Sequence, residues 1–176
     1  MKNALILHAW YSKPKDIWYP WLKKELEKKD YQVFLPELPT MNTNLPDMKK
    51  MLRCIDTSKY INKETIVIGH SLSCALAMRL AEKNKFSKMF LIAGWDYDDL
   101  FAPHKLFWPN KINHKKIKIN VKKIFCVTSD NDPYTTAFQT NEMNKRLNGK
   151  FILIKNAGHF GEKDKCNKIP QLLDFL

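Results

Sequence analysis

The stretch "GHSLS" at residues 69–73 places one serine, Ser71, between an apolar run and a segment with the small-residue pattern of a helix. It is a near match to G-x-S-x-G, in which small neighbours let a nucleophilic serine stand on a tight strand-to-helix turn. Taken alone the match is weak, because a serine that caps an ordinary helix gives the same pattern.

A serine hydroxyl needs a base, and the base needs a group that orients it. On an α/β sheet these residues follow in the order serine, acid, histidine, each after a later strand. "NAGHFGEK" (156–163) supplies His159, the only histidine of the five with this order and position. His8 and His70 precede or adjoin the serine instead.

The acid comes from "TSDNDPYT" (128–135), where Asp130 and Asp132 compete. We prefer Asp132, because Pro133 biases the residue before it towards an extended backbone in the turn. Asp130 remains the substitute. The ordinary alternative for Asp132 is to cap the helix that follows.

Acyl transfer also requires two N–H donors for the oxyanion. The first is expected to be the backbone N–H of Leu72, directly after the nucleophile. The second is expected from the loop after the first strand, at Trp10 or Ala9.

Short apolar runs alternate with amphipathic segments along the chain, which indicates a parallel sheet covered on both faces. The runs predict strands at 4–9, 31–36, 65–69, 88–94, 123–129 and 150–155. The amphipathic segments predict helices at 18–29, 45–55, 72–84, 135–147 and 169–176. Residues 95–118 are aromatic, contain two prolines and are expected to be irregular.

Right-handed crossovers favour the strand order 2-1-3-4-5-6 in a three-layer α/β/α fold. Its winding direction reverses between the first and third strands, where open α/β sheets bind ligands at the carboxyl ends. The loop "HAWYSKP" and the turn "GHSLS" both follow those two strands. Topology therefore also selects Ser71.

Length and composition fit one domain over residues 1–176, with 44% hydrophobic residues to form a core. No run approaches the roughly 20 apolar residues of a membrane span, and the N-terminus resembles a strand more than a signal peptide. Four scattered cysteines form no zinc or disulfide pattern, so we expect a cytoplasmic protein. No phosphate loop or carboxylate cluster appears, so neither cofactor nor metal is expected.

The net charge of +12 comes mostly from lysine and is densest in "KINHKKIKINVKK" (111–123). A nucleic-acid surface would be expected to show arginine and aromatic residues interleaved on one face. We therefore regard nucleic-acid binding as the weaker interpretation, and expect no membrane partner. A protein partner cannot be read from the sequence.

The whole set of motifs resembles the small serine hydrolases of the α/β-hydrolase fold, typified by retinoblastoma-binding protein 9 and bacterial YdeN-like proteins. The resemblance covers nearly the whole chain and rests on "LHAW", "WYPWLKKELE", "LPELP", "GHSLS", "SDNDPY" and "AGHF". Carried over by position, the family triad falls on Ser71, Asp132 and His159. The resemblance implies a minimal hydrolase without a large lid.

We therefore expect an esterase-like enzyme that cleaves an ester, thioester or amide of a small molecule or short peptide through an acyl-enzyme. Its apolar pocket is expected to include Tyr11, Trp95, Trp108 and Phe160. Two departures, Ala9 and Ser73 at positions where glycine is usual, motivate an alternative. In that alternative the scaffold is catalytically weakened and binds a protein or ligand.

Overall fold

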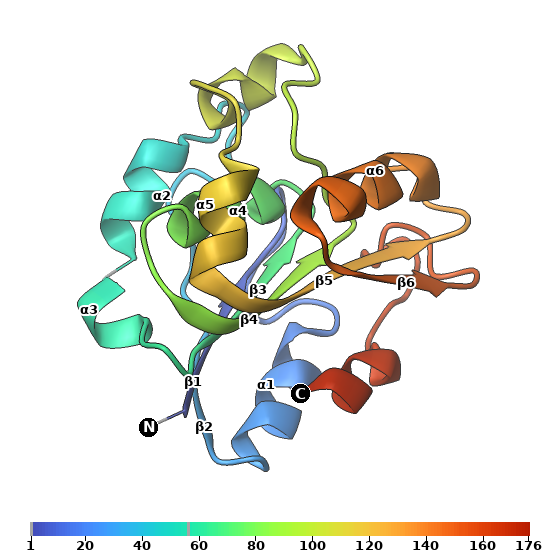
Figure 1. Cartoon of the computed structure of the whole chain (residues 1–176). Helices are drawn as coiled ribbons and strands as arrows, with labels where there is room; N and C mark the ends of the chain where they lie inside the picture. Colours follow the sequence, from blue (N-terminus) through green and yellow to red (C-terminus); the bar gives the residue numbers. More distant parts are fainter. Residues whose placement is uncertain (1, 56) are drawn as a thin grey trace.

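The computed structural model describes residues 2–55 and 57–176, and its centre is a six-stranded sheet (Figure 1). All neighbouring strands are parallel, and their order β2-β1-β3-β4-β5-β6 confirms the predicted one. The strands are β1 (Lys2–Leu7), β2 (Tyr31–Phe34), β3 (Ile66–His70), β4 (Phe86–Ile92), β5 (Val121–Ser129) and β6 (Lys150–Ile154).

Helices cover both faces of the sheet, which gives the expected three layers (Figure 1). The α-helices are α1 (Tyr19–Glu27), α2 (Met48–Cys54), α3 (Thr57–Tyr60), α4 (Ser73–Ala81), α5 (His114–Asn120) and α6 (Ala137–Leu147). Two 3-10 helices, η1 (Ala102–Phe107) and η2 (Pro170–Phe175), complete the described elements.

The sheet separates two cores, because successive side chains of a strand point to opposite faces. Leu5 and Leu7 of β1 pack with α2, α4, α5 and α6. Ala4 and Ile6 of the same strand pack with α1 and η2 on the other face. With both faces covered, a strand is apolar throughout, which is why continuous apolar runs located the strands.

The sequence predictions fail mainly between residues 95 and 118, which were expected to be irregular. This segment contains η1 and most of α5, whose first turn is capped by the side chain of Asn113 on the N–H of Lys116. Helix α5 buries only Ile117, so it lacks the apolar stripe by which helices are recognised. Helix α3 was also missed, and the C-terminal helix is of the 3-10 type.

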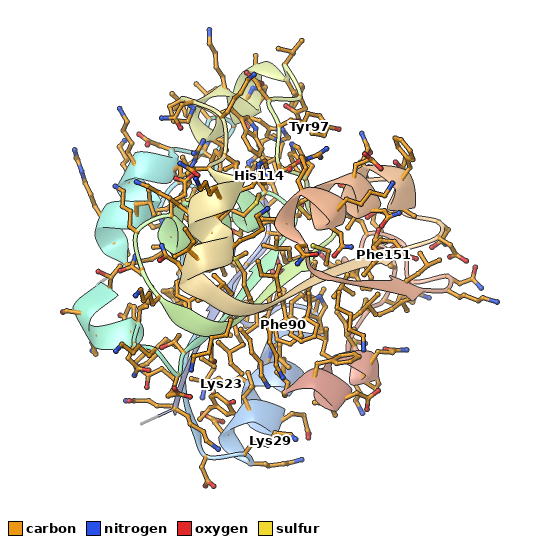
Figure 2. The ribbon with its side chains drawn as sticks, viewed as in Figure 1. Lys23, Lys29, Phe90, Tyr97, His114 and Phe151 are labelled. Carbon is orange, nitrogen blue, oxygen red and sulfur yellow. The ribbon has the colours of Figure 1, made fainter. Side chains whose placement is uncertain are left out.

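Charge is spread widely over the surface. Figure 2 shows Lys23 of α1, and Lys29 just after that helix, on the side of the molecule away from Tyr97 and η1. Within residues 2–55 and 57–176, no helix has the length and apolar character that crossing a membrane requires.

Candidate active site

Ser71 occupies a sharp turn between β3 and α4. Its φ of +54° lies in the left-handed region, which costs a residue with a Cβ about 1–2 kcal/mol. Its N–H donates to the carbonyl of Ile92 on β4 at 2.8 Å, which fixes the turn against the neighbouring strand. Gly69 is required here, because a Cβ at that position would lie 2.6 Å from the carbonyl oxygen of Ser73.

The hydroxyl of Ser71 lies in a hydrogen-bonded row with two residues from distant loops. Its Oγ is 2.8 Å from Nε2 of His159, and Nδ1 of His159 is 2.9 Å from Oδ2 of Asp132. A carboxylate only accepts, so the proton of the neutral imidazole is on Nδ1. The lone pair on Nε2 then accepts from the Ser71 hydroxyl, as a general base must.

Of the two candidate acids, Asp132 is the one whose carboxylate is hydrogen-bonded to the imidazole of His159. Asp132 is fully buried in its side chain and also accepts from the N–H groups of Tyr134 and Thr135. It does not cap α6, because that helix has a capping box of Thr136 and Gln139. Asp130 instead accepts from the N–H of Asn156 and does not contact the imidazole.

The loop that carries His159 is built by short polar contacts. Asp164 accepts from the N–H groups of both His159 and Gly161, at 3.0 and 2.9 Å. Gly158 has a φ of +55°, and a Cβ there would lie 1.9 Å from an Asp164 oxygen. Asn131 accepts from the N–H of Gly158 and so joins this loop to the one with Asp132. Neither Asp164 nor Asn131 was predicted from the sequence.

Two backbone N–H groups are available beside the serine. Among the described residues, neither the Leu72 N–H nor the Trp10 N–H has a protein acceptor, and both residues border the same cavity as Ser71. The Ala9 N–H is already used, because it donates to the hydroxyl of Tyr19 at 2.9 Å. Of the two candidates in the first loop, Trp10 is therefore the one with a free donor.

The two departures from glycine are accommodated. The φ of Ala9 is not positive, so this position needs no glycine. Ser73 is completely buried, and its hydroxyl donates to the carbonyl of His8 at 2.6 Å. The extra side-chain atoms thus form a contact between α4 and the end of β1 instead of a clash.

A cavity of about 790 Å³ opens over the serine. This volume is typical of small-molecule sites, which range over about 300–1,000 Å³. Aromatic residues are the largest group in its lining, and charged residues also border it. The aromatic lining is Trp10, Tyr11, Trp95, Tyr97, Phe101, His104 and Tyr134, and the charged lining is Asp99, Glu162, Lys163 and Asp164.

Of the four residues predicted for the pocket, Tyr11 and Trp95 border this cavity, and Trp108 and Phe160 do not. Phe160 has a φ of +57°, and its ring is fully buried in the core on the α1 side of the sheet. Trp108 packs in the other core, 6.2 Å from the ring of Trp95. The prediction that Trp108 and Phe160 line the pocket is therefore corrected, because each ring packs into a core.

Two further histidines are buried and uncharged. Burial lowers the pKa of His8, whose Nε2 accepts from the N–H of Leu38. Burial, and then the neighbouring His159, lower the pKa of His70 to about 3. No group of His, Cys, Asp and Glu side chains in the described part of the chain is arranged to bind a metal.

The low pKa of His70 predicts a specific loss of stability in acid. Between its unfolded value near 6.5 and its folded value near 3, only the unfolded chain binds the proton, so stability falls as pH falls. When the pH is lowered from 7 to 5, we expect the free energy of unfolding to fall by about 2 kcal/mol more in the wild type than in His70→Asn. Urea unfolding of both proteins at the two pH values measures this, and equal losses would contradict it. His8 is common to both proteins and cancels.

Comparison with known proteins places the chain among hydrolases. The family model described as serine hydrolase matches residues 4–176. The chain is 27% identical to serine hydrolase RBBP9 of Rattus norvegicus over 150 residues, which covers 81% of this chain and 77% of that protein. It is 22% identical to YdeN of Bacillus subtilis, covering 99% of this chain and 94% of YdeN.

Solved structures share the fold at lower identity. The crystal structure of B. subtilis YdeN superposes with a TM-score of 0.90 at 20% identity, covering 99% of this chain and 96% of that one. A carboxylesterase structure from Nitrososphaera gargenis has a TM-score of 0.71 at 12% identity, covering 99% and 88%.

Proposed function

The chain belongs to the serine hydrolase family, and from this premise we propose that Ser71, His159 and Asp132 form its catalytic triad. The observation that carries the proposal is the row of hydrogen bonds from the Ser71 hydroxyl through the imidazole to a fully buried carboxylate. A nucleophile, a base and an orienting acid in contact form the arrangement that acyl transfer needs.

In the proposed reaction Ser71 Oγ attacks the carbonyl carbon of an ester, thioester or amide, while His159 Nε2 takes the hydroxyl proton. Asp132 stabilises the imidazolium that forms. The N–H groups of Leu72 and Trp10 donate to the oxyanion of the tetrahedral intermediate.

Collapse of that intermediate breaks the bond to the leaving group, which receives the proton from His159. The acyl group then stays on Ser71 as an ester. Water attacks this ester in the second half, again with His159 as the base, and releases the acid and the free serine. No cofactor or metal enters these steps.

We propose a small substrate with an apolar acyl or leaving group. The proposal is supported by the aromatic lining of the cavity and by a volume suited to a small molecule. The activity would then be that of a carboxylesterase, with a small-molecule or short-peptide acyl compound as substrate. A reducing cytoplasm is the proposed compartment, because all four cysteines are free.

The two residues that suggested a catalytically weakened binding module no longer support that alternative. It rested on Ala9 and Ser73, and the first has an ordinary backbone conformation while the second makes a buried hydrogen bond. A shift to binding alone would leave no requirement for an aligned serine, imidazole and carboxylate.

Hydrolysis of p-nitrophenyl esters from acetate to octanoate tests the proposed substrate class. Each CH₂ that enters the cavity contributes about 0.8 kcal/mol, so we expect kcat/KM to rise about fourfold per carbon until the cavity is filled. Steady-state rates at fixed pH measure it, with a no-enzyme blank for each ester. Activity that is independent of chain length would contradict an apolar pocket.

A further inference from the structure

A buried chain of hydrogen bonds runs through two residues that the proposed reaction does not use, Tyr19 and His70. The N–H of Ala9 donates to the Tyr19 hydroxyl at 2.9 Å, and that hydroxyl is 2.7 Å from Nδ1 of His70. At its other end, Nε2 of His70 is 2.9 Å from the carbonyl oxygen of His159. Tyr19 and His70 are 0% and 1% exposed, so water does not compete for these bonds.

The chemistry of the groups fixes the direction of every bond in this chain. A carbonyl only accepts, so Nε2 of His70 carries the proton that it donates to His159. Because burial lowers the pKa of His70 to about 3, the ring is neutral and Nδ1 is an acceptor. The hydroxyl of Tyr19 therefore donates to Nδ1, and its oxygen lone pair accepts from Ala9. Each donor has one acceptor.

The hydrogen-bonded chain connects the three loops that carry the proposed reaction. His70 is directly followed by the nucleophile Ser71, and Ala9 is directly followed by Trp10, the proposed oxyanion donor. The third contact is to the main chain of His159, the proposed base. Tyr19 comes from the first turn of α1, the helix below the sheet in Figure 1.

We propose that Tyr19 and His70 are positioning residues, which hold the nucleophile turn, the oxyanion loop and the base loop in register with one another. This inference rests on the proposed function. Neither side chain borders the cavity, so their effect on the reaction passes through the main chain of the three loops. Misplacement of a reacting group by about 1 Å can cost roughly a hundredfold in rate.

Three substitutions interrupt the chain at defined points. Tyr19→Phe removes the hydroxyl that joins Ala9 to His70. His70→Asn keeps an acceptor near the position of Nδ1 but removes the donor to His159, and His70→Gln does the reverse. Ile68→Val is the matched control, because it also perturbs a fully packed residue of β3 but touches no hydrogen bond of the chain.

The experiment measures kcat and KM on p-nitrophenyl butyrate for each variant, with active sites counted by fluorophosphonate titration and Tm recorded alongside. We expect kcat per titrated site to fall about 10- to 100-fold in Tyr19→Phe and in both His70 variants, with KM within about twofold of wild type. Ile68→Val should keep its kcat even though its Tm falls.

A double variant separates positioning from general destabilisation. If Tyr19 and His70 act as one unit, Tyr19→Phe combined with His70→Gln should lose no more kcat than the more impaired single variant. The inference is overturned if the losses multiply, if the single variants keep kcat within about twofold, or if Ile68→Val loses as much.

The reaction of the wild-type protein with the fluorophosphonate distinguishes a failure of the positioning role from a failure of the proposed function. If the wild type reacts with the fluorophosphonate and the variants have the same kcat per titrated site, the positioning role alone is overturned. A folded wild-type protein that does not react would overturn the proposed function, and the positioning role with it.

Discussion

Ser71→Ala is expected to lower kcat on p-nitrophenyl butyrate by roughly 10⁵- to 10⁶-fold, close to the uncatalysed background. Removal of the nucleophile disables the whole triad, because its three members act as one unit and their contributions are not additive. The fold should persist. An alanine keeps the same strained turn, and the hydroxyl that is lost bonds only to the imidazole of His159 among the described residues.

Steady-state hydrolysis with a parallel thermal melt measures this effect. Ser87→Ala is the matched control, because the Ser87 hydroxyl donates to the carbonyl of Thr65 near the amino end of β4, away from the cavity. It should hydrolyse the ester at the wild-type rate. Residual activity of Ser71→Ala above about one per cent of wild type would contradict a nucleophilic role for this serine.

Asp132→Asn is expected to lower kcat by about 10³- to 10⁴-fold, because an amide in this place can donate to Nδ1 and so favours the wrong tautomer of His159. The proton would then be on Nε2, which could no longer accept from Ser71. The amide oxygen can still accept from Tyr134 and Thr135, so the turn itself should form.

Asp130→Asn is the paired control, and it separates the two aspartates that the sequence analysis left open. Its amide oxygen can continue to accept from the N–H of Asn156, so the expected change in kcat is less than about threefold. The pH dependence of kcat/KM for all three proteins completes the measurement. A large loss in Asp130→Asn with little loss in Asp132→Asn would reverse our assignment of the acid.

The strand order could be predicted because the central strands are apolar on both faces and because a parallel sheet limits the topology. The lysine-rich helix α5 could not. Only one of its seven side chains is buried, and its first turn is capped by the single residue Asn113. The sequence therefore contains no periodic apolar pattern that would predict this helix. Local sequence thus located elements that bury much apolar surface and missed those that bury little.

The side chains of the proposed triad could be selected from the sequence for the same reason, since each follows a recognisable strand. Their surroundings could not, because they depend on contacts between distant segments. Tyr19 and His70 are 51 residues apart, and His70 and His159 are 89 apart. Residue type alone also misled at Phe160, where a left-handed turn directs an aromatic ring next to the base into the core.

The central claim is tested most directly by intact-mass and peptide-mapping analysis after treatment with a fluorophosphonate. We predict one adduct per chain, located on Ser71, which forms in wild type and is absent from Ser71→Ala and strongly reduced in Asp132→Asn. A folded wild-type protein that stays unmodified, or an adduct on a different residue, would contradict the account.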